Sequence, residues 1–231
     1  MKRRVLCLVT AGTLGLSMLP ISEVWCATPG PGTTPAKTVL TVENDILFAF
    51  LAEPEYHLRR AQAYLQKNDF PEATQELETV RAFVRLERAR AEPAAVDKLV
   101  DALVELGAFT RDSKKSTDTA KGLARVARLV HLALASHGQQ MAQASWADKA
   151  WQVTGQHLYG AELHLRQGLA WSDQVLKDEQ QNLLKENAVL AKALMEGSGC
   201  GNSWAEEAAA PQIAAMRQLL EAVWTPTSVA Q

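Results

Sequence analysis

This chain of 231 residues has few cysteines, little strand-like alternation of apolar and polar residues, and a net charge close to zero. Its three cysteines, Cys7, Cys26 and Cys200, are too few for the disulfide framework of a small secreted domain. No stretch alternates between apolar and polar residues for long enough to predict a strand. The formal net charge is only −2, which gives no electrostatic reason to expect nucleic acid as a partner. A disulfide scaffold, a sheet protein and a nucleic-acid binder are therefore disfavoured.

Catalytic and cofactor motifs are missing as well. The chain has no Cys-x-x-Cys-His for covalent haem and no metal-binding pattern of defined Cys/His spacing. The sequence therefore indicates a protein that is not an enzyme. A triad assembled in space from distant residues would leave no such pattern, so an enzyme stays as a weaker alternative.

What the chain does have is a typical export signal at its N-terminus. Lys2, Arg3 and Arg4 are followed by an apolar run over residues 5–19 and by small and polar residues up to Ala27. This order predicts a secretory signal peptide over residues 1–27, cleaved near Cys26 or Ala27, and a periplasmic or secreted mature protein. No later apolar run is long enough to span a bilayer.

The remaining residues predict an all-α fold, a multi-helix antiparallel bundle of long helices. We divide the chain into a Pro/Gly/Thr leader expected to be disordered (28–40), an N-terminal helical hairpin region (41–107), a bundle of long helices (117–224) and a tail (225–231). Residues 41–224 are expected to pack as one domain.

Local signals set the expected helix boundaries. Asp69, Pro71 and Glu72 predict a helix start. Pro54 predicts a kink or a restart, and Gly107 predicts a helix end. Ser145 and Asp148 resemble a capping box that would begin a helix. Heptad spacing on the C-terminal side predicts a short coiled-coil seam of Leu176, Leu183, Leu190 and, completing it, Leu194.

The region around residues 57–85 resembles a single tetratricopeptide-type helical hairpin. Ala61, Tyr64, Ala73 and Leu77, with Asn68-Asp69-Phe70 at the turn, carry the resemblance. His57, Arg60 and Arg85 depart from the repeat pattern, and no second copy follows. The hairpin is also faintly similar to those of exported YfdX-type helical proteins. The resemblance implies close helix packing and a surface for protein partners.

Histidines and one thiol are the candidate functional side chains. His137 and Met141 are four residues apart, a spacing that suits a copper ion or haem iron, and His157 and His164 share one helix face seven residues apart. The same histidines could instead make hydrogen bonds between helices. Cys200, in a glycine-rich turn before a helix, is a candidate reactive or intermolecular thiol, or an incidental one.

Two functional interpretations follow from these patterns. The first is an exported, non-enzymatic protein-interaction or scaffold module of the bacterial periplasm that binds a protein partner or itself. The second is a periplasmic helical bundle that binds a small ligand, a metal or haem through His137, Met141, His157 and His164.

Overall fold

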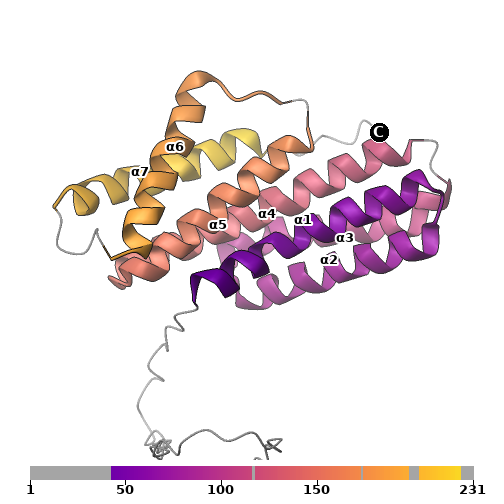
Figure 1. Ribbon diagram of the computed structural model, residues 1–231, viewed down its shortest axis with the longest axis horizontal. Coiled ribbons are helices and arrows are strands. Elements are labelled where there is room, and N and C mark those ends of the chain that lie inside the picture. The colour runs from indigo at the N-terminus through magenta and orange to yellow at the C-terminus, as the bar shows by residue number, and fades with distance from the viewer. Residues whose placement is uncertain (1–42, 116–117, 173, 198–202, 225–231) are drawn as a thin grey trace, which may run out of the picture. The chain divides into compact units, whose positions relative to one another are not determined.

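The chain folds into helices throughout the part that the structure describes, which confirms the predicted all-α bundle. The computed structural model describes residues 43–115, 118–172, 174–197 and 203–224, and no strand occurs among them (Figure 1). The signal peptide, the leader, the tail and Cys200 lie outside these ranges. The elements are α1 (Asn44–Gln66), α2 (Phe70–Arg90), α3 (Pro93–Asp112), the short 3₁₀ helix η1 (Ser113–Lys115), α4 (Thr119–Ala147), α5 (Trp151–Ala170), α6 (Asp178–Met195) and α7 (Ser203–Val223).

Helix α4 is the centre of the packing. It contacts α5 most extensively and also packs against α1, α2, α3 and α7, while α6 packs on α5 and α7. In Figure 1, α1, α4 and α5 run side by side, and α6 is steeply inclined to α5, on which it packs. The sequence accounts for this position, because α4 is apolar around most of its middle: residues 129–137 are all buried. None of the helices in the described residues is both long enough and apolar enough to span a membrane.

The α1–α2 hairpin forms where the sequence predicts it. Asn68 takes the left-handed φ of 59° that reverses the chain, and Pro71 and Glu72 lie in the first turn of α2. The Asp69 side chain does not cap the helix, however. The prediction of a restart at Pro54 is also wrong, since α1 continues through this residue. Pro54 is buried, and burial of its ring offsets the single backbone hydrogen bond that it cannot donate.

Three other boundary predictions are corrected by the structure. Helix α3 continues past Gly107 to Asp112, because Gly107 is buried inside the helix. No helix begins at Ser145: α4 runs through it, and α5 begins at Trp151. The Ser145 hydroxyl donates to the Met141 carbonyl (2.8 Å) and accepts from the Thr154 hydroxyl (3.0 Å), so it joins the two helices instead of capping one.

The predicted coiled-coil seam is wrong in its first half. Leu176 precedes α6, and Leu183 is only partly buried. The buried stripe of α6 follows the ordinary three-and-four spacing of a helix that packs on α5 and α7: Leu184, Asn187, Leu190, Ala191 and Leu194.

Small residues let α5 and α6 approach closely at Gly155. A Cβ built on this glycine would lie 2.6 Å from the Ala191 carbonyl oxygen and 2.8 Å from the Met195 nitrogen, which are backbone atoms that cannot rotate away. At Gly107 a Cβ would meet nothing closer than the Arg81 guanidinium at 3.6 Å. The two glycines therefore have different roles in similar helical surroundings.

We expect alanine at these two positions to change stability in opposite directions. Gly155→Ala should lower the free energy of unfolding by about 2 kcal/mol or more, because overpacking outweighs the gain in helix propensity. Gly107→Ala should raise it by about 0.5–1 kcal/mol. Urea unfolding followed by circular dichroism measures both, and equal effects would contradict the close contact at Gly155.

Candidate functional site

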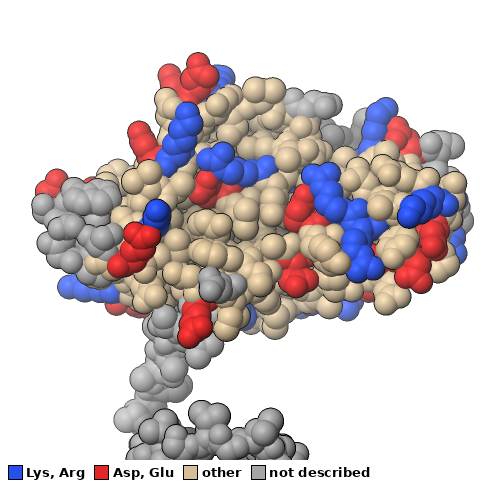
Figure 2. All heavy atoms as spheres, in the orientation of Figure 1, with Lys and Arg blue, Asp and Glu red and all other residues tan. Residues whose placement is uncertain are grey.

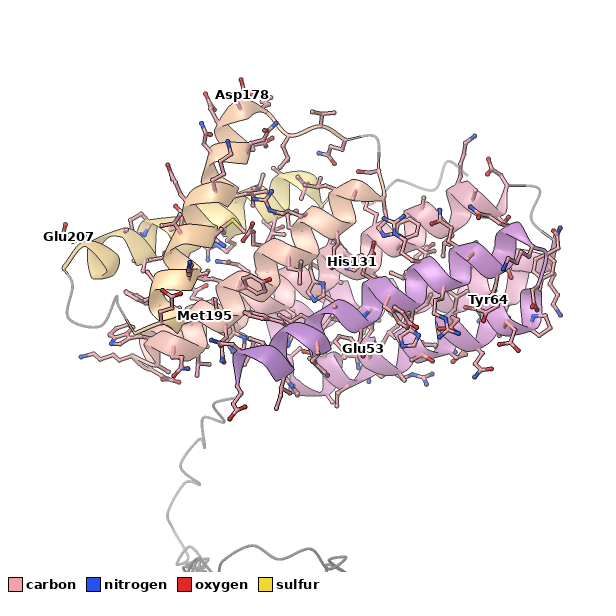
Figure 3. All side chains as sticks on the ribbon, in the orientation of Figure 1. Glu53, Tyr64, His131, Asp178, Met195 and Glu207 are labelled. Carbon is pink, nitrogen blue, oxygen red and sulfur yellow. The ribbon has the colours of Figure 1, made fainter. Side chains whose placement is uncertain are left out.

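Four of the five histidines lie on the facing sides of the antiparallel pair α4 and α5. His131 and His137 come from α4, and His157 and His164 come from α5. His131, His137 and His164 are 0–3% exposed, while His157 keeps some contact with solvent. Figure 3 shows His131 between the ribbons of α1 and α5. The fifth histidine, His57, lies on α1 beside Glu53 and Glu76.

A chain of hydrogen bonds joins Glu55 on α1 to the first histidine pair. His131 Nε2 lies 2.9 Å from Glu55 Oε2, and His131 Nδ1 lies 3.2 Å from His164 Nδ1. His164 Nδ1 is also 3.1 Å from Gln167 Oε1. Since an amide oxygen only accepts, His164 Nδ1 must carry the proton, and it donates to the bare Nδ1 of His131. His131 Nε2–H then donates to the carboxylate, and His164 Nε2 is left with its lone pair.

Glu55 accepts hydrogen bonds from three donors, one on its own helix α1, one on α4 and one on the residue that follows α5. In addition to His131, its carboxylate accepts from Trp171 Nε1 (2.7 Å) and from Arg59 Nε (2.7 Å). The Arg59 guanidinium lies over the Trp171 ring, 3.9 Å from the ring centre. Partial burial by itself would raise the pKa of Glu55, but these hydrogen bonds outweigh it and lower the pKa below its usual value. The group is therefore an ionised carboxylate at neutral pH.

Burial keeps His131, His157 and His164 neutral. It lowers the pKa of His164 to about 3 and that of His157 to about 4, with smaller contributions from the neighbouring histidines. Burial also lowers the pKa of His131, although Glu55 acts in the opposite direction. At neutral pH each of these three rings thus has one N–H donor and one lone pair.

The second histidine pair faces a carboxylate from α2. His137 Nε2 lies 3.2 Å from Glu87 Oε2, but the contact does not have hydrogen-bond geometry. Both ring nitrogens of His137 and Glu87 Oε1 are buried without a hydrogen-bond partner in the described residues. Arg90 Nη2 is 3.6 Å from Glu87 Oε2, and the Arg90 side chain is half exposed. Unpaired buried polar atoms are costly, so this place requires a partner.

A cavity of about 70 Å³ lies next to these groups, where α1, α2, α4 and α5 meet. Its polar lining comes from Glu87, Arg90, His137, Gln156, His157 and His164. The apolar lining comes from Leu47, Phe50, Leu51, Phe83 and Leu134. The volume is enough for a few waters or one small molecule, and it is well below the roughly 300–1,000 Å³ typical of drug-sized ligand pockets.

The structure brings together three of the four residues that the sequence suggested as metal ligands. His137, His157 and His164 line the same cavity, whereas Met141 is partly buried one turn away on α4 and is not in the lining. In the described ranges, no three His, Cys, Asp or Glu side chains are arranged to hold a metal ion.

Sequence reasoning missed Glu55, Glu87 and His131. The sequence contains a signal for Glu87. It follows Val84 after three residues and so continues the buried stripe that Val80 and Val84 begin. A carboxylate in a core stripe needs a partner. Glu55 gave no such signal, since two of its three donors, His131 on α4 and Trp171 just after α5, are far away in sequence.

Comparison with known proteins gives no relative from which a function could be transferred: no protein-family model matches the chain, and no curated protein and no solved structure is significantly similar to it.

Proposed function

We propose that this chain is an exported, non-enzymatic helical protein of the bacterial periplasm that binds a protein partner in an apolar groove between α1 and α2. The single observation that supports this proposal best is the groove itself. It encloses about 310 Å³, and its lining residues recur at helical spacing along both helices: Phe50, Glu53, Pro54 and His57 on α1, and Thr79, Val80, Ala82, Phe83 and Leu86 on α2.

The spacing of the lining fits a third helix. The α1 wall falls at i, i+3, i+4 and i+7. The α2 wall has the same spacing with Val80 added at i+1, so two turns of α1 face two turns of α2. A helix lying along such a groove can bury an apolar stripe of its own against both walls. Leu86 is 49% exposed and Phe83 is partly exposed, so apolar area is available there.

The charge of the groove indicates the kind of partner. Glu53 is a half-exposed carboxylate in the lining, and no Lys or Arg lines the groove. On the face shown in Figure 2, basic and acidic side chains are interspersed, without a large field of one sign. The occupant that fits is an amphipathic helix of a partner protein with a Lys or Arg beside its apolar stripe.

Leu86→Glu should abolish this binding without unfolding the protein. Amphipathic helical peptides selected against the exported chain should bind the variant at least tenfold more weakly, because a carboxylate would enter the apolar groove beside Glu53. The matched control is Val189→Glu on α6, where the side chain is 64% exposed and remote in sequence. Peptides that bind both variants equally well would place the interaction elsewhere.

Export itself is open to a direct test. Leu14→Arg interrupts the apolar run of the proposed signal peptide, and we expect the chain then to stay unprocessed in the cytoplasm. Fractionation with immunoblotting measures this, with Thr28→Arg, just after the expected cleavage region, as the control. Processing and release that are unchanged by Leu14→Arg would contradict the proposal.

The histidine-lined cavity favours a second candidate function, the binding of a small ligand. The observation behind it is the set of buried polar atoms of His137 and Glu87 that have no partner. The metal and haem forms of this interpretation have less support. His137, His157 and His164 line one cavity, but in the described part of the chain no three His, Cys, Asp or Glu side chains have an arrangement that could hold a metal ion. A cavity of about 70 Å³ is also far too small for haem.

A further inference from the structure

We infer that the cavity between α1, α2, α4 and α5 binds a small primary ammonium ion, with Glu87 as its counter-ion. The inference deepens the small-ligand candidate and rests on it, and it is independent of the groove. The lining combines a buried carboxylate with imidazole nitrogens, and both kinds of group can accept hydrogen bonds.

The acceptors are identified by the contacts around each group. Glu87 is 6% exposed, and its Oε1 has no hydrogen-bond partner in the described residues. His164 Nε2 keeps a lone pair, because Gln167 fixes the proton on Nδ1. His137 and His157 are also imidazoles of the lining, and a ring nitrogen with a lone pair can accept a hydrogen bond. An ammonium group has three N–H donors, which can bond to Glu87 Oε1 and to such lone pairs.

The charged side chains of the lining favour a cation over an anion as the ligand. Among the described residues that line the cavity, Glu87 alone has a carboxylate, and its buried Oε1 has no hydrogen-bond partner there. Arg90 is the one Lys or Arg among them, and it is half exposed, with its Nη2 3.6 Å from Glu87 Oε2. A buried anion would face Glu87 directly, whereas a buried cation neutralises it.

Shape limits the length of the ligand. The apolar side of the cavity is formed by Leu47, Leu51 and Leu134 and by the rings of Phe50 and Phe83. With about 70 Å³ available, only a short alkyl chain of one to three carbons fits beside the ammonium group. Arg90 is the most exposed of the described residues that line the cavity, so entry is on its side.

The test is a titration of the exported chain with ethylammonium chloride at pH 7, followed by the side-chain nitrogen resonances of His137 and His157. We expect saturable shifts in roughly the millimolar range, because so few heavy atoms limit the affinity. Ethanol and sodium acetate, which are similar in size, should bind at least tenfold more weakly. Glu87→Gln, which keeps the shape and removes the charge, should weaken ethylammonium binding at least tenfold, and Glu105→Gln on α3 should leave it unchanged.

The remaining outcomes overturn the inference in distinguishable ways. Tighter binding of acetate would show that the cavity takes anions through Arg90, and uptake of Zn²⁺ that depends on Glu87 would show a metal site. In both cases the small-ligand function would stand without the ammonium ion. If none of the probes shifts the histidine resonances, the cavity holds only water, and the small-ligand function fails as well.

Discussion

Acidification from pH 6.5 to pH 4 should remove about 6 kcal/mol of folding free energy from this protein. The cause is the set of buried histidines, whose ordinary pKa is 6.5 and whose pKa in the folded state falls to about 4 for His157 and about 3 for His164. Within this window the unfolded chain binds protons at these rings and the folded chain does not. Each ring therefore contributes about 1.4 kcal/mol per pH unit.

The sign and the window follow from the lowered pKa values. The stabilisation is complete above pH 6.5 and is lost progressively as the pH falls towards 4. His131 acts in the same direction, whereas the pKa of Glu55 lies below its ordinary value of 4.5, so its contribution is lost only at still lower pH. A loss of about 6 kcal/mol is comparable to the whole stability of many domains, so unfolding near pH 4–5 is expected.

Urea unfolding at several pH values measures this loss. His157→Gln should reduce the fall between pH 6.5 and pH 4 by about 3 kcal/mol, because one proton-binding site is removed. Gln152→His places a histidine at an exposed position of the same helix and should leave the slope unchanged. A total loss below about 2 kcal/mol in the unmodified chain would show that the histidines are protonated in the folded state.

Glu55→Ala should have the second largest effect, a loss of about 3 kcal/mol at pH 7. The substitution leaves His131 Nε2–H, on a fully buried side chain, and Trp171 Nε1–H without their acceptor. It also removes the carboxylate through which α1 contacts His131. Removing one partner of a buried charged contact costs more free energy than the intact contact contributes to stability, because the remaining partner stays buried without a hydrogen bond.

Two further variants calibrate this loss. Glu55→Gln keeps one acceptor oxygen and should cost about half as much. Glu105→Ala breaks an exposed pair with Arg125 at 2.6 Å and should cost under about 1 kcal/mol. If Glu55→Ala were as mild as Glu105→Ala, the hydrogen-bond chain from Glu55 to His164 would not be a stabilising element.

The sequence predicted the fold class because apolar spacing is a local property. Stripes such as Leu77, Val80 and Val84 define a helix and its buried face without knowledge of its neighbours. Boundaries at Gly107 and Ser145 were wrong because packing decided them: Gly107 is buried within α3, and the Ser145 hydroxyl bonds to α5. The local signals of these two residues point the other way.

The candidate site was predicted in part, for a related reason. His157 and His164 share a face by their spacing alone, so their proximity to His137 required only that α4 and α5 pack together. Their partners Glu55 and Glu87 come from the first hairpin, and no rule of spacing connects them to α4 or α5. Such contacts follow from tertiary packing and are not present in any short window of sequence.

Phe50 and Phe83 have a consequence beyond packing, because both rings line the α1–α2 groove and also the histidine-lined cavity. Their centres are 4.6 Å apart, so the groove and the cavity share this pair of packed rings. An occupant of the groove that moves either ring changes the lining of the cavity, and an occupant of the cavity that moves either ring changes the lining of the groove. Thermodynamic linkage makes any such influence equal in both directions, so peptide affinity measured with and without ethylammonium would report it.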